Sequence, residues 1–326
     1  MPIIESMERP LEKRRLGRTE LSIAPLVLGG NVFGWTADEK TSFDLLDRFA
    51  AAGLNAVDTA DSYSRWVPGN QGGESEAIIG KWMKSRGNRD KVVVVTKVGS
   101  DMGQGKKDLS AAYIEKAVES SLKRLQTDSI DLYLSHWPDG STPYEETLGA
   151  YQKLIAKGKI RYAGASNLDA GQLTAALKIA SQKSLPRYEV LQPEYNLYDR
   201  SSFDGALSDL CVKEEIGVIT YFSLARGFLS GKYRSEADLG KSPRGGAVGG
   251  YLNPRGFGIL AALDAVASRH SAKPAEVALA WVIARPGITA PIASATTLPQ
   301  VESLIRAASL KLGASDVAEL DAASAA

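Results

Sequence analysis

The sequence predicts an α/β protein folded as a (β/α)8 barrel of the TIM type, with an N-terminal hairpin and a long loop after the seventh strand. Eight short apolar runs alternate with longer stretches of helical periodicity. Some runs, such as the four valines at 92–95, are apolar at every position, which is typical of a buried parallel sheet. Because eight strand–helix units fit a closed barrel best, we expect residues 1–326 to form one barrel domain.

The predicted elements follow one another along the whole chain. The predicted strands cover residues 24–28, 56–58, 92–97, 130–136, 160–166, 188–192, 218–222 and 289–294. The predicted helices cover residues 41–51, 74–85, 110–125, 144–156, 170–181, 202–213, 274–284 and 298–307. Ser110 and Thr142 stand where two of these helices begin, and Gly87 and Gly158 stand where two others end, as expected of helix caps.

Two segments lie outside the eight units. Residues 13–24 predict a short strand pair with its turn at 17–19, placed to close the bottom of the barrel. Residues 235–256 are rich in Gly, Pro and Arg and predict a long structureless connection. An open doubly wound sheet is the alternative fold. That fold normally carries Gly-x-Gly-x-x-Gly after its first strand, whereas residues 29–34 read GGNVFG, with a different spacing and no helix start.

Composition excludes several classes of function. The formal net charge is +1 without a long block of like charges, which argues against binding to nucleic acid or to an anionic membrane surface. No run is long enough to span a bilayer, and residues 1–11 lack the apolar centre of a signal peptide, so we expect a cytoplasmic protein. Cys211, the single cysteine, is predicted to be buried in a helix, and with only two histidines no metal site is expected.

Polar residues cluster at the C-terminal ends of the predicted strands, here called the rim, where barrel enzymes place their active sites. Asp58 ends the second strand, Tyr63 follows it, Lys97 ends the third and His136 ends the fourth. Each has a structural explanation alone, but four at consecutive strand ends indicate a catalytic group. A phenol is a poor acid at neutral pH, so we expect the Lys97 ammonium to lower the pKa of Tyr63 and make it a general acid.

The other two groups have matching roles. Asp58 would keep Lys97 charged and oriented, and His136 would bind or orient a carbonyl oxygen. Nothing in this residue set supplies reducing electrons, so a cofactor must bring them.

Six segments resemble the aldo-keto reductase superfamily, over roughly residues 13–310. They are DTADSY (58–63), VTK (95–97), LSH (134–136), AGASN (163–167), LQPEYN (191–196) and LARGFLSGKY (224–233). The resemblance implies an NADP(H)-dependent reductase of aldehydes and ketones, with Tyr63 as proton donor and Asp58, Lys97 and His136 completing the tetrad. The segment GKY and the long loop after it resemble the branch that includes bacterial general stress reductases and potassium-channel β-subunits.

The resemblance also implies a cofactor site. The nicotinamide would lie beside Gly30 and Asn31, stack on Tyr221, and present its carboxamide to Ser166, Asn167 and Gln192. The residues matching the segment that holds the pyrophosphate, here called the strap (residues 221–232), are Ser223, Leu224, Gly227 and Lys232.

The chain departs from the family pattern at three places. The strap lacks a proline between Ser223 and Leu224, so we expect it to be more mobile. No Arg or Lys occurs in residues 294–303, where a 2′-phosphate usually finds a positive charge. NADP(H) remains the predicted cofactor and NAD(H) the alternative. Trp137, next to His136, would shape the substrate pocket. The groups that remain for the phosphate are Ser294, Thr296, Thr297 and Gln300, or Arg226, Arg234, Arg244 and Arg255.

Further residues have two interpretations each. Phe33, Trp35 and Trp66 would either wall the substrate pocket or pack beneath the rim, and Asp61 is predicted to cap a helix. A second function is a cofactor-binding regulatory subunit with slow turnover. A third, a glycosidase, would pair Asp58 with Glu194 but leaves Lys97 and Tyr63 without a role. A small-molecule carbonyl compound is the expected partner, while the sequence leaves its identity, the direction of reaction and the oligomeric state open.

Overall fold

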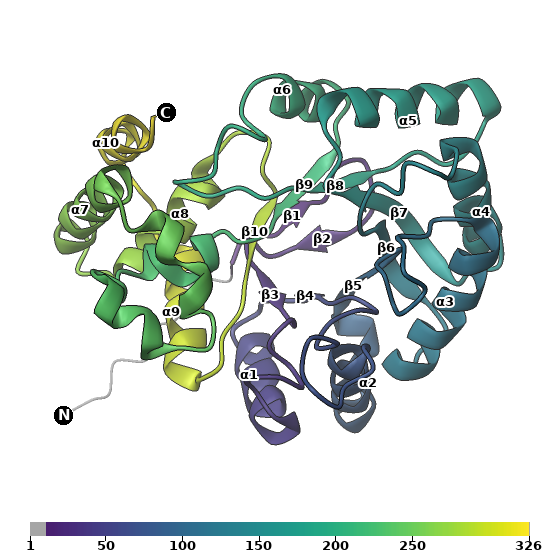
Figure 1. The fold of residues 1–326 in the computed structure, drawn as a ribbon, viewed down its shortest axis with the longest axis horizontal. Helices are drawn as coiled ribbons and strands as arrows, with labels where there is room; N and C mark the ends of the chain where they lie inside the picture. The colour runs from purple at the N-terminus through teal and green to yellow at the C-terminus, as the bar shows by residue number, and fades with distance from the viewer. Residues whose placement is uncertain (1–10, 326) are drawn as a thin grey trace.

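The computed structural model describes residues 11–325, in which eight parallel strands close into a barrel (Figure 1). The barrel strands are β3 (Val27–Gly29), β4 (Ala56–Asp58), β5 (Val93–Val98), β6 (Ile130–Ser135), β7 (Ile160–Ser166), β8 (Val190–Gln192), β9 (Gly217–Thr220) and β10 (Ala290–Ala293). Each strand pairs with the next in the chain, and β10 pairs with β3 to complete the ring. The predicted barrel is therefore confirmed, and the open sheet is excluded.

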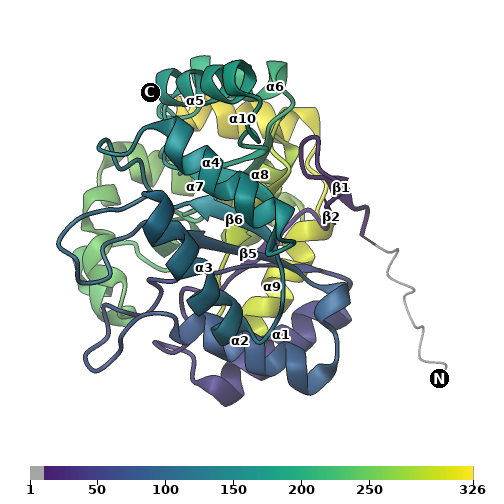
Figure 2. The same ribbon diagram turned by 90° about the vertical axis from the view of Figure 1, so that its right-hand side faces the viewer.

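Helices surround the strands on the outside of the barrel (Figures 1 and 2). They are α1 (Glu39–Ala51), α2 (Glu74–Arg86), α3 (Ala111–Leu125), α4 (Tyr144–Ala156), α5 (Ala170–Lys183), α6 (Ala206–Lys213), α8 (Pro274–Ala284) and α9 (Leu298–Ser309). The cap at Ser110 is confirmed, because its side chain accepts a hydrogen bond from the backbone of Tyr113. Gly87 ends α2 in the left-handed conformation, as predicted, whereas α4 is preceded by Pro143 in the cap position rather than Thr142.

A hairpin of β1 (Arg14–Arg15) and β2 (Ser22–Ile23) lies at the end of the barrel opposite the long loops (Figure 2). Leu16, Leu21 and Ile23 are buried in one cluster with inward-facing residues of the barrel strands. The hairpin thus closes the bottom of the barrel with apolar side chains, as the sequence predicts.

Alternation along each strand divides the core into two layers. In β6, Leu132 and Leu134 belong to the cluster inside the barrel, whereas Tyr133 packs in the larger cluster between strands and helices. Both sets are buried, so the strands have two apolar faces.

Residues 235–256 differ from the prediction of a structureless connection. They contain three 3-10 helices, η3 (Glu236–Lys241), η4 (Gly245–Ala247) and η5 (Gly249–Tyr251), and then the start of a long helix, α7 (Pro254–Arg269). Asn253 caps α7 by accepting a hydrogen bond from Gly256, and Pro254 occupies its first turn. Dense glycine and proline indicated a loop, although proline in the first turn is compatible with a helix start.

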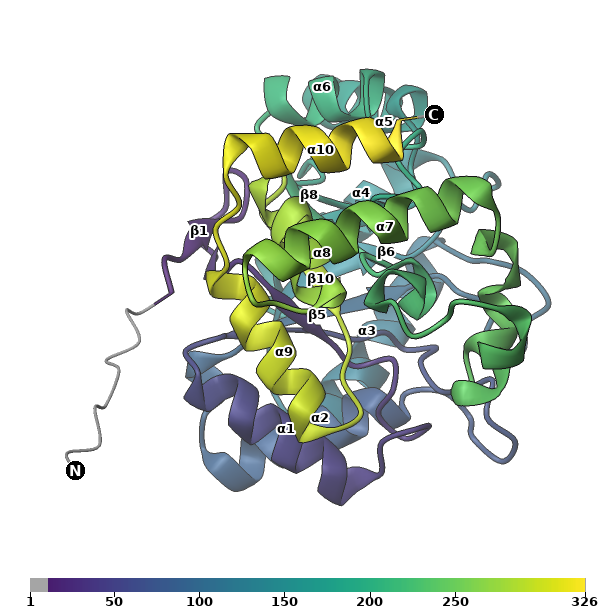
Figure 3. The ribbon, with the colours of Figure 1, turned by 90° about the vertical axis from the view of Figure 1, so that its left-hand side faces the viewer.

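Two helices were not among the predicted elements, α7 and α10 (Ala314–Ser324). They pack against each other on the outer side of α8 (Figure 3). Within the described residues, no helix combines the length and apolar character needed to cross a membrane.

Candidate functional site

A cavity of about 1150 Å³ opens at the rim, where the loops after the strands converge. Most of the residues predicted for the site line it. They are Asn31, Asp58, Tyr63, His136, Ser166, Asn167, Gln192, Tyr221, Ser223, Leu224, Gly227, Lys232, Ser294, Thr296 and Gln300. Two predicted residues, Gly30 and Lys97, lie beneath the lining.

Gly30 is a structural neighbour of the site. Its N–H donates to the carbonyl of Asp58 at 2.7 Å, and its carbonyl accepts from the hydroxyl of Ser75 at 2.7 Å. A Cβ at this position would lie 2.7 Å from that hydroxyl, so only glycine fits between the two elements. Gly29, not Gly30, faces the cavity.

Asp58, Lys97 and Tyr63 form a connected group at the cavity floor. The Lys97 Nζ donates to Asp58 Oδ2 at 2.7 Å, to the Thr59 carbonyl at 2.7 Å and to the Tyr63 hydroxyl at 2.9 Å. The Tyr63 hydroxyl is itself 3.2 Å from Asp58 Oδ2. Lys97 is completely buried and Asp58 is 2% exposed, so a fully desolvated ion pair supports one phenol.

The pKa of Tyr63 differs in direction from the sequence prediction. Burial raises it well above 10, and the negative charge of Asp58 raises it further. Burial also lowers the pKa of Lys97, against the opposing effect of Asp58. The prediction considered Lys97 alone and omitted desolvation, which is the larger effect here. The phenol is therefore protonated at neutral pH.

His136 completes the group on the other side of Tyr63. Its ring lies 6.1 Å from the Tyr63 ring, centroid to centroid, and its Nδ1 is 2.9 Å from the hydroxyl of Ser100. Burial lowers the pKa of His136 well below 6.5, and Lys97 lowers it further, so the imidazole is neutral. Ser100 was not predicted; it lies in the loop after β5 and has no motif of its own.

A network of amides and hydroxyls links the predicted nicotinamide residues to this group. Gln192 Nε2 donates to Asp58 Oδ1 at 2.8 Å, and the Ser166 hydroxyl donates to the Gln192 carbonyl at 2.7 Å. The Tyr221 hydroxyl donates to Asn167 Oδ1 at 2.7 Å, while Asn167 Nδ2 donates to the His136 carbonyl at 2.9 Å. The structure thus brings residues from five strand ends, those of β4, β6, β7, β8 and β9, into one connected surface.

The strap runs along the cavity through an unusual backbone. Phe222, Ala225 and Arg226 all have positive φ although none is glycine. Ser223 sits between them, and its hydroxyl donates to the Thr220 carbonyl at 2.9 Å and lies 3.0 Å from Thr220 Oγ1. These contacts anchor the turn at the position where the strap lacks the proline of the family pattern, between Ser223 and Leu224.

The last strand supplies a second polar edge of the cavity. Ser294 donates to Asn31 Oδ1 at 2.6 Å, and Thr296 donates to Gln300 Oε1 through its backbone at 2.8 Å. No positive charge comes from this segment, but five cationic side chains line the same cavity. They are Arg65, Arg226, Lys232, Arg244 and Lys273.

Two of the arginines considered from the sequence are bound elsewhere. Arg234 pairs with Asp264 at 2.8 Å, and Arg255 donates to the carbonyls of Tyr198 and Ser324. Lys273 was not predicted, since it precedes α8 and lies far from β10 in sequence. Glu276 positions it, because this carboxylate accepts from the Lys273 backbone at 3.1 Å and pairs with Arg306 of α9 at 2.6 Å.

Aromatic rings form the outer wall of the cavity near Tyr63. Trp66 and Trp137 line it, with Trp66 6.1 Å from the Tyr63 ring and Trp137 stacked on His136 at 5.5 Å. Trp35 supports Trp66 edge to face at 5.7 Å, and Phe33 is completely buried. Of the three rings predicted to wall the pocket, only Trp66 lines the cavity, and Trp137 lines it as well. Trp35 supports Trp66, and Phe33 packs beneath the rim.

The structure also places three further residues that the sequence singled out, Cys211, Asp61 and Glu194. Cys211 is buried in α6, as predicted, and burial raises the pKa of its thiol to about 12. Asp61 does not cap a helix; its side chain is buried, with 3% exposed. Glu194 lines the cavity. Both oxygens of Asp58 are already hydrogen-bonded, one to Lys97 and the other to Gln192. Asp58 and Glu194 therefore do not resemble the two free carboxylates of a glycosidase.

Comparison with known proteins gives consistent relatives over almost the whole chain. The model of the "Aldo/keto reductase family" matches residues 25–325. The "Uncharacterized oxidoreductase YrpG" of Bacillus subtilis is 36% identical over 313 residues, covering 93% of this chain and 92% of that protein. The "Aldo-keto reductase YhdN" of the same organism is 31% identical, covering 93% and 89%. A "Probable voltage-gated potassium channel subunit beta" of rice is 32% identical, covering 91% of each chain.

Proposed function

This chain belongs to the aldo/keto reductase family, and we propose that it is an NADP(H)-dependent oxidoreductase that reduces aldehydes or ketones to alcohols. The observation that supports this most directly is the buried group in which Lys97 donates to both Asp58 and Tyr63 at the floor of the cavity. Its phenol faces a cavity large enough for a dinucleotide and a small substrate.

The chain's own residues hold and move the proton. The nicotinamide, when bound, supplies the hydride. Tyr63 keeps its proton at neutral pH because its pKa is raised, and it gives that proton to the carbonyl oxygen as negative charge develops there. Lys97 stabilises the phenolate that remains, and the neutral His136 orients the carbonyl oxygen. Trp66 and Trp137 form the apolar side of the cavity next to Tyr63.

The cavity suits an anionic cofactor. Arg244 is largely buried, and its Nη2 finds no hydrogen-bond partner among residues 11–325. A buried guanidinium nitrogen without a partner is costly, and a phosphate would satisfy it. Lys232 and Arg226 would hold the pyrophosphate with the strap, while Lys273 would supply a positive charge beside Ser294 and Thr296 for a 2′-phosphate. This set favours NADP(H) over NAD(H).

The test compares the wild type with Tyr63→Phe, following the absorbance of NADPH, and of NADH in parallel, with a reactive aromatic aldehyde. We expect the wild type to oxidise NADPH, and kcat of the variant to fall by about 100-fold or more because a positioned general acid contributes about that much. The variant should still bind NADPH, since the phenol is outside the proposed cofactor contacts. Equal turnover in both proteins would refute the role of Tyr63.

A cofactor-binding subunit with slow turnover is the second candidate, favoured by the relative named as a potassium channel subunit. A single-turnover measurement separates the two. Fast hydride transfer followed by slow steady-state turnover would indicate slow cofactor release, as expected of a regulatory subunit. Fast multiple turnover would indicate a metabolic reductase.

A further inference from the structure

One carboxyl close to Tyr63 has no role in the proposed chemistry. Asp61 is 3% exposed, and neither of its oxygens accepts a well-formed hydrogen bond from any residue between 11 and 325. An ionised carboxylate in this position would be costly, because it would have lost its water without gaining donors. The arrangement therefore suits a carboxyl that carries its proton.

The backbone of Asp61 is part of the segment that positions Tyr63. Residues 59–63 continue beside β5 beyond the end of β4: Thr59 N–H donates to the Val95 carbonyl at 2.8 Å, and Asp61 N–H to the Lys97 carbonyl at 3.2 Å. Two residues later, the Tyr63 carbonyl accepts from Gly73 N–H at 3.3 Å. A displacement of Asp61 would therefore be transmitted to both Lys97 and Tyr63.

The side chain of Asp61 faces the layer between the strands and helices α2 and α3, where one ion pair already exists. Glu76 of α2 is completely buried and accepts hydrogen bonds from Arg124 of α3 and from Thr96, each at 2.6 Å. Arg124 also packs on Gly73, where a Cβ would come within 2.3 Å of its Nε. Arg124 is thus shared between the pair with Glu76 and the backbone that closes the Tyr63 loop.

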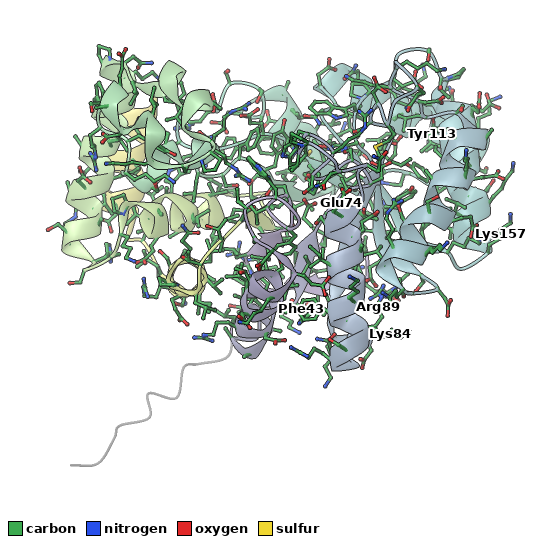
Figure 4. The ribbon with its side chains drawn as sticks, turned by 60° about the horizontal axis from the view of Figure 1, so that its bottom comes forward. Phe43, Glu74, Lys84, Arg89, Tyr113 and Lys157 are labelled. Carbon is green, nitrogen blue, oxygen red and sulfur yellow. The ribbon has the colours of Figure 1, made fainter. Side chains whose placement is uncertain are left out.

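Charged and titratable groups face Asp61 from every neighbouring element. They are Glu76 of α2, Arg124 and Tyr113 of α3, Tyr151 of α4, Lys97 of β5 and Tyr133 of β6. Figure 4 shows Tyr113 on α3 and Glu74 at the start of α2, at the same end of these two helices. Burial, and after it the charge of Glu76, raise the pKa of Asp61 to about 8, because Arg124, the backbone of Ser62 and Lys97 oppose them only in part.

We propose that Asp61 is a positioning residue for Tyr63 that works only as a neutral acid, so that its ionisation switches turnover off at alkaline pH. This rests on the proposed reductase function. An ionised Asp61 competes with Glu76 for Arg124, draws that side chain away from Gly73, and so loosens the segment that presents Tyr63. The substrate and cofactor contacts remain, so kcat changes and KM does not.

The test compares wild type with Asp61→Asn, which keeps the shape without the charge, and with Asp61→Leu. Asp128→Asn, an exposed acid remote from the rim, is the control for the same chemical change. NADPH-dependent aldehyde reduction is measured from about pH 6 to about pH 10. At neutral pH, we expect kcat of Asp61→Asn to stay within about 2-fold of the wild-type value. Near pH 8, kcat of wild type and of Asp128→Asn should fall about 10-fold, whereas kcat of Asp61→Asn should not fall.

Unfolding of the protein without cofactor gives a readout that needs no turnover. The pKa of an unfolded aspartate is about 4, so wild type loses stability relative to Asp61→Asn as pH rises from about 4 to about 8, and the difference is constant above that. The same alkaline fall in Asp61→Asn, or a kcat at neutral pH as low as in Asp61→Leu, would overturn the proposal. An unfolding difference independent of pH would overturn it as well.

The two proposals fail in distinguishable ways. A wild type that reduces no carbonyl at any pH would refute the reductase function. The unfolding series would still decide whether Asp61 is neutral.

Discussion

Lys97 and Asp58 form an ion pair at 2.7 Å with almost no exposure to water. Burying two charges costs more than their attraction returns unless further hydrogen bonds complete the site, so such a pair is weak evidence for stability. Here the additional partners are Tyr63 and Gln192, both lining the cavity. At the scale of single residues, the pair is therefore best explained by the phenol it supports.

Lys273 gives the residue-scale prediction on cofactor choice. Lys273→Gln should raise the Kd for NADPH about 5-fold, since a charge-assisted hydrogen bond to phosphate contributes about 1 kcal/mol at an exposed position. The Kd for NADH should not change, because NADH lacks the 2′-phosphate. Both constants can be measured by quenching of tryptophan fluorescence.

Lys178→Gln is the matched control, an exposed lysine on α5 outside the cavity. Equal losses of NADPH and NADH affinity in Lys273→Gln would contradict a role at the 2′-phosphate and would instead place Lys273 at the pyrophosphate.

The strap is the element for which the sequence predicts increased mobility. Proline fixes the backbone, and the segment Ser223-Leu224 lacks it. In the structure, the bonds from Ser223 to Thr220 anchor the same turn, and Arg226 lies over the Phe222 ring at 4.3 Å. Side-chain hydrogen bonds and a cation–π contact thus replace a covalent restraint.

At the element scale, Ser223→Ala tests whether these side-chain hydrogen bonds restrain the strap. Loss of buried hydrogen bonds worth about 1 kcal/mol should make the strap more mobile and increase the dissociation rate of NADPH about 5- to 10-fold, with a smaller effect on association. Stopped-flow displacement of bound NADPH measures that rate. Ser208→Ala in α6, which removes an exposed hydroxyl bonded to the Gly205 carbonyl, should have no effect. An unchanged dissociation rate in Ser223→Ala would mean that the strap is held by its other contacts.

At the scale of the whole molecule, the two ends of the barrel, seen in Figure 2, carry different kinds of residues. The hairpin fills the bottom with Leu16, Leu21 and Ile23, whereas the rim carries buried charge and backbone strain. Apolar burial at one end stabilises the barrel enough to hold costly polar groups at the other.

Gly17→Ala tests how much the hairpin at the bottom of the barrel contributes to the stability of the whole fold. Gly17 has φ +59°, and a Cβ there would lie 2.4 Å from the backbone nitrogen of Gly217. The left-handed backbone costs an alanine about 1 kcal/mol, and the clash with backbone adds to this, so we expect the free energy of unfolding to fall by about 3 kcal/mol. Gly53→Ala is the control, with φ +81° and no atom within 4 Å, and should lose only about 1 kcal/mol. Urea unfolding measures both, and equal losses would show that the close approach does not matter.

The sequence by itself determined the barrel and the four residues that meet at the floor of its cavity. Strand and helix periods are local, so β4, β6 and β7 begin where their apolar runs begin. The rim prediction followed because parallel strands in a barrel all end on one face. Asp58, Tyr63, Lys97 and His136 could therefore be grouped without coordinates. The helix α7 was missed because its glycines and proline resemble a loop until Asn253 caps it.

Only the tertiary structure decided which groups lose their water and which distant segments meet. It showed that burial is the largest effect on the pKa of Tyr63 and that Lys273 reaches the cavity from the position before α8. It also showed that Asp61 is buried with no hydrogen-bond partner for its side chain among residues 11–325, rather than capping a helix. Desolvation depends on everything packed around a group, including residues far away in the chain. A local sequence pattern specifies on which strand or helix a side chain lies. Its electrostatic environment is set only when the whole barrel has closed.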